Sequence, residues 1–336
     1  MIFRTLVLLA FLICPDAFAE PVKGISLAHI HRRGSGYGSD ECRQQLEAIK
    51  ATGANWIAIN DFAYMQSVND PGLRFERDGS MRREDIIQTI KDAHAIGLKV
   101  LVKPHIWSRD FWNGDKWVGQ IEMKTDAEWK QWFENYTKYV LYNAQIAAET
   151  RADSVCIGVE LVKTSERESD WRALVAEVRK IYKGPICYSA EFQEWRNIKW
   201  WDAVDVIGIT AYFPVAGVDS PDDATIRAGW SKVYDELIPF AARFNRTICF
   251  TEIGYTPSTT AAREPWSSKI GGEDAQLQAR LYRIALEEAA KRDQLVGVFA
   301  WKWFTSRQWR RHEHADPFAI QDQAMVLDVL QQAWRQ

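Results

Sequence analysis

The sequence lacks a strong excess of charge, and it also lacks the long apolar run that a membrane-spanning helix requires. Of its 336 residues, 42 are Lys or Arg and 45 are Asp or Glu, which gives a net charge of −3. Proteins that bind nucleic acids or anionic membrane surfaces generally present a basic surface, and a membrane span needs ~20 apolar residues. We therefore expect no nucleic-acid partner and no stable membrane insertion.

Cysteine is scarce, and neither a CxxC pair nor a Cys/His spacing typical of zinc sites occurs. Cys156, Cys187 and Cys249 lie inside apolar runs, where a free thiol behaves as a small buried apolar group. We expect these three and Cys42 to be buried free thiols. Disulfide pairing is the alternative if the protein is exported.

The first nineteen residues have the pattern of an export signal. A short basic start ends at Arg4, Thr5–Ile13 is apolar, and Ala17-Phe18-Ala19 has the small residues of a cleavage site. The apolar run is too short to span a membrane as a helix. We expect cleavage after Ala19, which leaves residues 20–336 as one periplasmic or secreted domain.

Short β-rich runs alternate with longer amphipathic stretches through the rest of the chain. Strands are predicted at Gly24–His29, Trp56–Asn60, Val100–His105, Ser154–Glu160, Pro185–Ala190, Val204–Tyr212, Thr247–Ile253 and Leu295–Trp301. Helices are predicted at Asp40–Thr52, Arg83–Ile96, Asp126–Thr150, Asp170–Tyr182, Ile226–Phe244 and Asp274–Arg292. This alternation indicates an α/β protein with a single (β/α)8 (TIM) barrel. A doubly wound sheet is the alternative, but the GxGxxG turn that usually follows its first strand is missing.

Two of the predicted strands end in a carboxylate. The fourth runs SVCIGV into Glu160, and the seventh runs TICFT into Glu252. A buried, unpaired carboxylate costs several kcal/mol, so packing alone does not favour one in either place. The ends of barrel strands form the active site in TIM barrels, and paired carboxylates there carry out glycoside hydrolysis. The alternative is that each belongs to an ion pair at the rim.

Four strand ends together resemble glycoside hydrolase family 113, whose members are retaining (β/α)8 endo-β-mannanases. They are Gly158-Val159-Glu160, Thr251-Glu252-Ile253-Gly254, Lys103-Pro104-His105 and Trp301-Lys302-Trp303. The resemblance implies that Glu160 is the acid/base and Glu252 the nucleophile, with carboxyl groups roughly 5–5.5 Å apart. One departure concerns Val159, which stands where many relatives in the wider clan have an Asn that binds the sugar 2-hydroxyl.

Strand parity assigns the neighbouring side chains, because alternate residues face the barrel interior. If Glu160 points inward, Gly158 and Cys156 do so too, and Val159 faces the helices. Lys103 and His105 would share an inward face and donate hydrogen bonds to sugar hydroxyls, with a rim ion pair as the alternative. Thr210 and Tyr212 would also share the inward face. We expect the Tyr212 hydroxyl to hold the nucleophile carboxylate in its ionised form, and Trp301 to form the floor of the subsite for the reacting sugar.

Further candidates for substrate binding follow other strands. Asn60 and Glu191 come directly after the second and fifth strands, and Glu191 is the main rival carboxylate; Glu194 and Asp205 are weaker ones. Trp107, Trp112 and Trp117 lie in the long loop after the third strand and are interpreted as a wall of the sugar site, because long βα loops carry specificity. Five others fall on helical patterns and are expected in the core, namely Trp129, Trp132, Trp171, Trp230 and Trp334.

Two histidine pairs raise the alternative of a metal site. His29 and His31 end the first strand as in metal-dependent amidohydrolases, but the fifth and sixth strands offer Glu191 and Tyr212 where those enzymes need His. His312 and His314 lie in a polar loop and are expected to be solvated. We therefore expect neither a metal nor another cofactor.

The leading hypothesis is an exported, retaining endo-glycosidase that cleaves β-1,4-mannan or glucomannan through a covalent glycosyl-enzyme. Its partner would be a polysaccharide or oligosaccharide. The same chemistry on another β-linked polysaccharide, such as an exopolysaccharide, is one alternative. A sugar-binding barrel without catalysis is the other.

Overall fold

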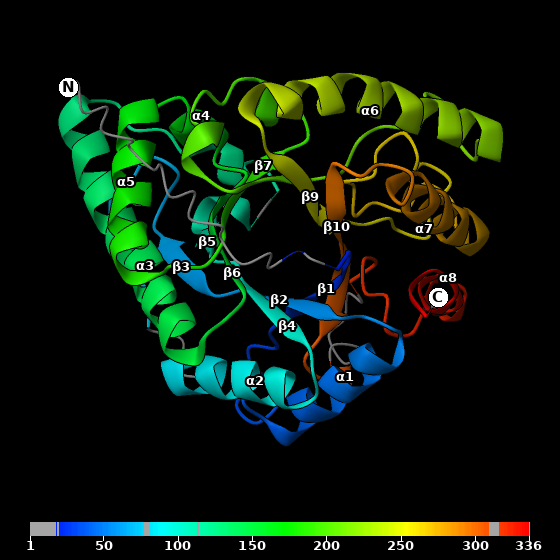
Figure 1. Ribbon diagram of the computed structural model, residues 1–336, viewed down its shortest axis with the longest axis horizontal. Helices are drawn as coiled ribbons and strands as arrows, with labels where there is room; N and C mark the ends of the chain where they lie inside the picture. The colour runs from blue at the N-terminus through cyan, green and yellow to red at the C-terminus, as the bar shows by residue number, and fades with distance from the viewer. Residues whose placement is uncertain (1–17, 19, 77–80, 113, 309–315, 336) are drawn as a thin grey trace, which may run out of the picture.

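A closed barrel of parallel strands forms the centre of the protein, as a computed structural model shows (Figure 1). The structure describes residues 18, 20–76, 81–112, 114–308 and 316–335. The order of the strands around the barrel is β1-β10-β9-β8-β7-β6-β4-β2. These strands are β1 (Val22–Ala28), β2 (Trp56–Ile59), β4 (Lys99–Val102), β6 (Ser154–Val159), β7 (Ile186–Glu191), β8 (Val206–Thr210), β9 (Thr247–Ile253) and β10 (Leu295–Phe304). The predicted single (β/α)8 barrel is confirmed.

Helices surround the barrel on all sides in Figure 1. They are α1 (Asp40–Ala51), α2 (Arg83–Ala95), α3 (Asp126–Thr150), α4 (Val162–Ser165), α5 (Glu168–Ile181), α6 (Asp223–Phe244), α7 (Ala275–Ala289) and α8 (Ala324–Trp334). Short 3-10 helices are η1 (Arg109–Phe111), η2 (Val118–Gln120), η3 (Glu194–Arg196) and η4 (Trp201–Ala203). The helices α1, α3, α6 and α7 begin at capping side chains. The hydroxyl of Ser39 accepts a hydrogen bond from the Cys42 backbone at the start of α1.

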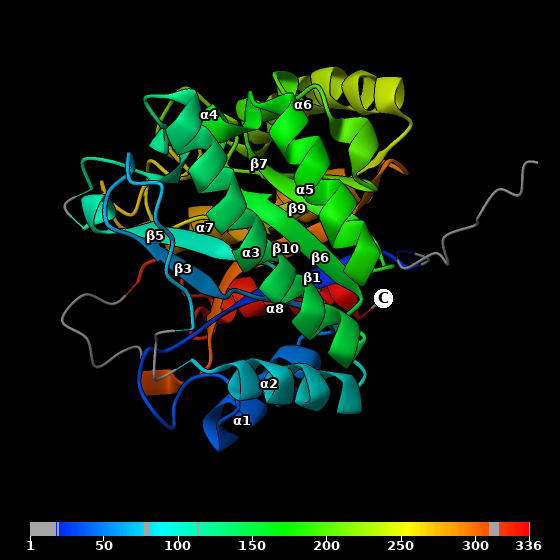
Figure 2. The same ribbon diagram turned by 90° about the vertical axis from the view of Figure 1, so that its left-hand side faces the viewer.

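Two additional strands lie outside the barrel and were missed in the sequence. β3 (Phe62–Met65) and β5 (His105–Ser108) form a separate parallel sheet in which Phe62 pairs with His105. The predicted strand Val100–His105 therefore divides in two, because β4 ends at Val102 and the chain bends before His105. In the side view of Figure 2, β3 and β5 extend beyond the end of the barrel at which the βα loops gather.

The barrel interior is filled by one or two side chains from each strand. The members of this cluster are Val22, Trp56, Ala58, Leu101, Cys156, Val159, Cys187, Val206, Cys249 and Phe299. All eight barrel strands contribute, so these side chains meet inside the barrel. Cys42, Cys156, Cys187 and Cys249 are buried free thiols, as predicted.

The parity predicted for the end of β6 is wrong. The pairing of β6 with β7 shifts register between Cys156 and Val159, which is the mark of a β-bulge. Val159 consequently joins the interior cluster. Gly158 instead faces the helices, where a Cβ atom would meet Trp171 and Tyr188 at 2.8 and 2.9 Å. The bulge lets Cys156 and Glu160 keep their predicted inward direction although the residues between them do not alternate.

Most of the tryptophan serves the core rather than a ligand. Seven of the described tryptophan side chains are fully buried: Trp56, Trp132, Trp171, Trp195, Trp200, Trp201 and Trp230. The five helical tryptophans predicted as core, which include Trp129 and Trp334, are at most 9% exposed. Trp171 and Trp200 stack at 4.9 Å and 8° behind β6 and β7. This packing makes the wall that supports those two strands rigid.

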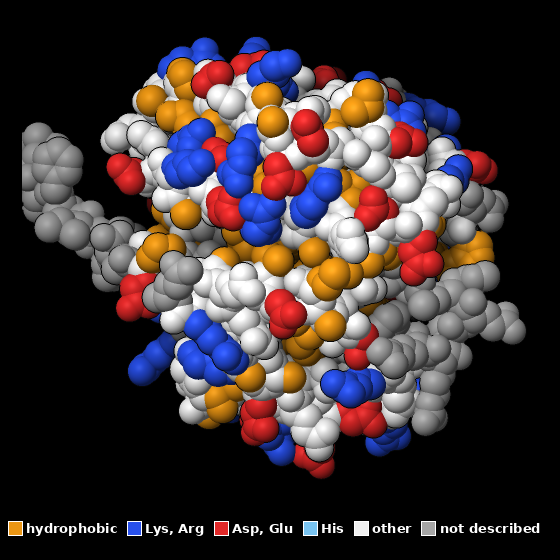
Figure 3. All heavy atoms as spheres, turned by 90° about the vertical axis from the view of Figure 1, so that its right-hand side faces the viewer, with side chains coloured by type: hydrophobic (Ala, Val, Ile, Leu, Met, Phe, Trp, Pro, Cys, Tyr) orange, Lys and Arg blue, Asp and Glu red, His pale blue; other side chains and the backbone are white. Residues whose placement is uncertain are grey.

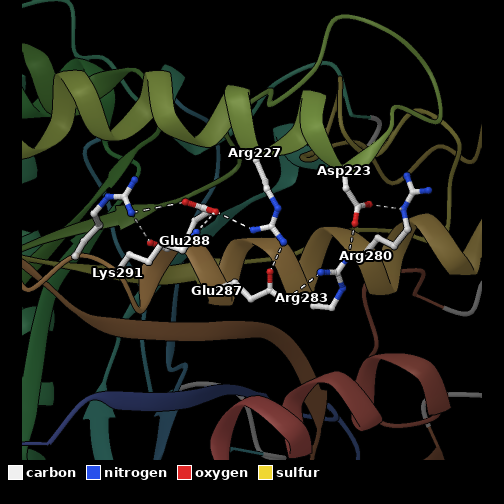
Figure 4. A network of polar contacts seen from close by, with 8 residues as sticks. Asp223, Arg227, Arg280, Arg283, Glu287, Glu288 and Lys291 are labelled. Carbon is white, nitrogen blue, oxygen red and sulfur yellow. Dashed lines mark hydrogen bonds and ion pairs between the residues drawn. The ribbon is translucent and has the colours of Figure 1, made fainter.

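The outer face over α6 and α7 carries interspersed basic and acidic side chains (Figure 3). Figure 4 shows the ion pairs that join the two helices: Asp223 contacts Arg280 and Arg283, and Arg227 contacts Glu287 and Glu288. Exposed ion pairs individually contribute little to stability. Together these ion pairs connect α7 to α6 on the outside of the barrel.

Candidate active site

Glu252 lies at the end of β9 and is held by two donors. The ammonium of Lys103 is 2.5 Å from Glu252 Oε1, and the hydroxyl of Tyr212 donates to Oε2 at 2.9 Å. Lys103 is fully buried and Glu252 is 5% exposed. Both contacts favour the ionised carboxylate. The predicted contact between Tyr212 and this carboxylate is therefore present, and Lys103 faces inward as expected but contacts Glu252.

Glu160 follows β6 and is surrounded differently. Its carboxylate accepts one hydrogen bond, from the Thr210 hydroxyl at 2.6 Å. Its backbone N–H donates to the Ser189 carbonyl at 2.8 Å, and its φ of 54° is left-handed. Residues other than Gly rarely adopt that backbone conformation. Together with the bulge in β6, this backbone directs the Glu160 side chain to Thr210 at the end of β8.

The two carboxyl groups differ in their surroundings. Burial and, after it, the negative charge of Glu252 raise the pKa of Glu160 to about 8. The hydrogen bond from Thr210 acts in the opposite direction. Two acidic groups in one site whose environments favour different protonation states are the arrangement of an acid and a nucleophile. At neutral pH the raised pKa of Glu160 favours its protonated form.

An aromatic and cationic group borders the pair. Trp301 on β10 stacks with His105 at 6.1 Å and 28°, and the Lys103 ammonium lies 5.3 Å from the Trp301 ring centre. Burial lowers the pKa of His105 well below its ordinary value, and the charges of Lys103 and Lys302 lower it further. His105 is consequently neutral. Among the described residues, its buried Nε2 atom has no hydrogen-bond partner.

The other predicted substrate-binding residues lie around this centre. Asn60 is 1% exposed at the end of β2, and within the described chain its Oδ1 atom has no hydrogen-bond partner. Trp107 lies on β5, two residues from His105, and meets the ring of Trp112, which is 80% exposed. Glu191 ends β7, and its charge raises the pKa of Glu160. The side chains that contact the two glutamates directly include Lys103, Thr210 and Tyr212.

Glu191 and Glu194 are less suited to direct chemistry than Glu160. Glu191 Oε2 accepts hydrogen bonds from the backbone N–H groups of Gln193 and Glu194. Glu194 is buried, and its carboxylate contacts Tyr188. Asp205, the other weaker candidate, binds Arg179 and the Ile186 backbone at the opposite end of the barrel strands. Asp205 is therefore structural, as its position before β8 predicted.

The sequence analysis missed Asp61 and Trp266. Asp61 is 5% exposed, accepts a hydrogen bond from Asn143 at 2.9 Å, and has a pKa raised to about 6 by burial. It follows an apolar strand, so the rule that found Glu160 and Glu252 could have found it. Trp266 is 49% exposed and stacks on Phe192 at 5.3 Å and 11°. It lies far from any predicted strand, so the sequence carries no comparable signal.

The described chain contains no group of three or more His, Cys, Asp or Glu side chains placed to hold a metal ion. His29 is buried, and its Nδ1 atom accepts a hydrogen bond from the Tyr37 backbone. His312 and His314 lie outside the described residues, as do residues 1–17 and 19 of the expected export signal. Within the described ranges, no helix has the length and apolar character needed to cross a membrane.

A TIM barrel with an asymmetric pair of carboxylates at the ends of two strands has the architecture of a glycoside hydrolase. The sequence pattern of glycoside hydrolase family 113 matches residues 25–322. The chain belongs to that family, and it is a glycosidase.

Solved structures agree with this assignment. The family 113 β-mannanase AaManA from Alicyclobacillus acidocaldarius is 25% identical, with a TM-score of 0.83 over 95% of this chain and 99% of that one. Another family 113 β-1,4-mannanase is 24% identical, with a TM-score of 0.82 over 94% and 99%. A β-glucuronidase from Ruminococcus gnavus, 14% identical, shares the fold at a TM-score of 0.64 over 94% of this chain and 49% of its own. No curated protein matches the chain.

Proposed function

We propose that the protein is a retaining endo-glycosidase that hydrolyses β-1,4-mannan or glucomannan. The observation that carries the proposal is the asymmetry of the pair: Glu252 is bound by Lys103 and Tyr212, whereas burial and the Glu252 charge raise the pKa of Glu160 to about 8. A charged carboxylate beside a protonated one is what glycoside hydrolysis requires, and the resemblance to family 113 favours the retaining form of it. The similarity to family 113 β-mannanases supports mannan as the substrate.

The reaction proceeds in two steps. Glu252 attacks the anomeric carbon while Glu160 gives its proton to the departing glycosidic oxygen, so that a covalent glycosyl-enzyme forms. Glu160, now ionised, removes a proton from water, which attacks the same carbon and releases Glu252. The configuration at that carbon is retained. Donors on Glu252 assist the second step, because they stabilise the carboxylate that departs.

The environment of the pair supports roles for the neighbouring residues. Trp301 forms the floor on which the reacting sugar rests, and His105 and Asn60 offer polar atoms without partners in the described chain. Val159 has no polar side-chain atom, so it cannot bind the sugar 2-hydroxyl. The remaining polar atoms near the nucleophile must make that contact. Trp107, with Trp112, provides an aromatic wall for further sugar units.

Activity across four polysaccharides tests the proposal. Release of reducing ends from mannan, glucomannan, cellulose and xylan is measured for wild type and for Glu252→Gln, which keeps the side-chain shape. We expect turnover of mannan or glucomannan by wild type and none by the variant. Turnover of another β-linked glycan would change the substrate while keeping the mechanism. Binding without turnover by wild type would favour the sugar-binding alternative.

We further propose that the protein is exported and cleaved after Ala19, on the strength of the basic, apolar and small-residue pattern of residues 1–19. Expression of the full chain in a bacterium that carries the general export pathway tests this. N-terminal sequencing of periplasmic protein is expected to begin at Glu20. Accumulation of uncleaved protein in the cytoplasm would contradict it.

A further inference from the structure

A buried hydrogen-bonded chain begins at the residue after Glu160. The backbone N–H of Leu161 donates to the hydroxyl of Tyr188 at 2.9 Å, and that hydroxyl donates to Glu194 Oε1 at 2.7 Å. Tyr188 is fully buried and Glu194 is 2% exposed. The backbone that turns at Glu160 is therefore connected, through one phenol, to a carboxylate on the segment that follows β7.

The second oxygen of Glu194 closes the connection. Glu194 Oε2 accepts a hydrogen bond from the backbone N–H of Glu191 at 2.9 Å. In return, Glu191 Oε2 accepts from the backbone of Gln193 at 2.8 Å and of Glu194 at 3.2 Å. The segments after β6 and after β7 are thus joined, and Glu191, whose charge raises the pKa of Glu160, is fixed by the same contacts.

Tyr188 contacts the chain on both sides of Glu160. Its ring lies where a Cβ atom on Gly158 would be 2.9 Å away, and its hydroxyl meets Leu161. Glu160 between them has the left-handed φ of 54°. A residue other than Gly in that region is strained and persists only where its surroundings fix it. Tyr188 supplies contacts that fix it.

Packing alone does not explain the polar groups of this network. The Tyr188 ring meets the rings of Trp171 and Trp200 in a T-shaped arrangement, each at 5.1 Å. Such surroundings would favour an apolar side chain over a carboxylate. Neither Tyr188 nor Glu194 contacts Glu252, Lys103 or Trp301 in the structure. Their hydrogen bonds reach backbone atoms beside Glu160 and Glu191, and the side chain of Ser165 also contacts Glu194.

We propose that Tyr188 and Glu194 are positioning residues that hold Glu160 in the direction needed for proton transfer. This inference rests on the acid/base role of Glu160 proposed above. It predicts a defect confined to the step in which the leaving group takes a proton. A glycoside whose leaving group departs without a proton avoids that defect in its first step.

The test compares Tyr188→Phe with Tyr182→Phe. Both remove one buried hydroxyl near β6: that of Tyr182 donates to the Ala152 carbonyl at 2.7 Å, before the start of the strand. The value of kcat/KM is measured on an oligosaccharide of the preferred glycan and on the corresponding dinitrophenyl glycoside. Trapping with a fluorinated glycoside that forms a stable glycosyl-enzyme counts the active sites, so that a loss of folded protein is corrected.

Tyr188→Phe is expected to lower kcat/KM on the oligosaccharide by about 10- to 100-fold, the effect of a misplaced catalytic group, with less than about twofold change on the activated glycoside. Tyr182→Phe is expected to change neither rate beyond about twofold, because its hydroxyl is remote from the proton transfer. Glu194→Gln changes the carboxylate at the other end of the network while it keeps almost the same side-chain volume. The same selective loss is expected for this variant. It provides the test if Tyr188→Phe does not fold.

Equal losses on both substrates, or the same selective loss in Tyr182→Phe, would overturn the inference. Glu160→Ala separates this failure from that of the proposed function. If Glu160→Ala loses activity selectively on the oligosaccharide but Tyr188→Phe and Glu194→Gln do not, only the positioning role is wrong. If Glu160→Ala shows no selectivity either, the acid/base assignment and the positioning role both fail.

Discussion

Lys103 and Glu252 form a buried ion pair, with 2.5 Å between Nζ and Oε1 and the lysine fully withdrawn from solvent. Lys103 follows β4 and Glu252 lies on β9, so the contact crosses the barrel. An amine that only bound sugar hydroxyls would not need this position. The pair holds the negative charge where the proposed mechanism requires it.

Removing the lysine is expected to destabilise the protein. Lys103→Met leaves a buried carboxylate with Tyr212 as its remaining donor, and breaking a buried pair in this way costs about 3–5 kcal/mol. Urea denaturation measures the change in the free energy of unfolding. The double variant Lys103→Met/Glu252→Gln is expected to recover at least half of the loss, because no uncompensated charge remains. A Lys103→Met protein as stable as wild type would show that the pair contributes no net stability.

The pH profile of activity is expected to be bell-shaped, with an alkaline limb at about 8. Glu160 must be protonated for the first step, and burial and the Glu252 charge raise its pKa to about 8, so kcat/KM falls as pH rises through that value. In Glu160→Gln, assayed on a glycoside with an activated leaving group, this limb is expected to disappear. A limb that survived would mean that another group donates the proton, and Glu191 would be examined first.

Glu191→Gln is expected to move the alkaline limb to lower pH. The Glu191 charge raises the pKa of Glu160, and its removal makes Glu160 easier to ionise, so the protonated form is lost earlier as pH rises. The amide oxygen of Gln can still accept the backbone hydrogen bonds from Gln193 and Glu194. Glu236→Gln, in an exposed pair with Arg196, is the control and should leave the limb in place. Movement toward higher pH would contradict the electrostatic explanation.

Azide is expected to distinguish the roles proposed for Glu160 and Glu252. Glu252→Ala loses the nucleophile, so turnover of natural and activated substrates should both fall by at least about 1,000-fold. Azide that fills the vacated space should restore some rate and give a glycosyl azide of inverted configuration. Glu160→Ala should keep a burst on an activated glycoside and give the retained azide. NMR of the products decides between these outcomes, and an inverted azide from Glu160→Ala would reverse the two roles.

The barrel and the two glutamates could be predicted because their signals are local. Apolar strands that end in one carboxylate at positions 160 and 252, alternating with capped helices, carry the information within a few residues. Tyr212 and Lys103 followed from the same parity. Both side chains do point at Glu252.

The remaining details depend on contacts between segments that lie far apart in the sequence. The bulge in β6 arises from its pairing with β7, so parity failed at Gly158 and Val159. The β3–β5 sheet requires two βα loops to meet. The stack of Trp266 on Phe192 likewise joins segments that are 74 positions apart (266 − 192).

The β3–β5 sheet has a consequence for redesign of substrate preference. His105 and Trp107 stand on β5, whose backbone is hydrogen-bonded to β3 in register from Phe62 to Met65. A graft of the β5 loop alone would leave β3 as an unpaired edge. Phe62–Met65 and His105–Ser108 therefore form one exchangeable module, and a chimaera with a new specificity should transplant both segments from the same donor.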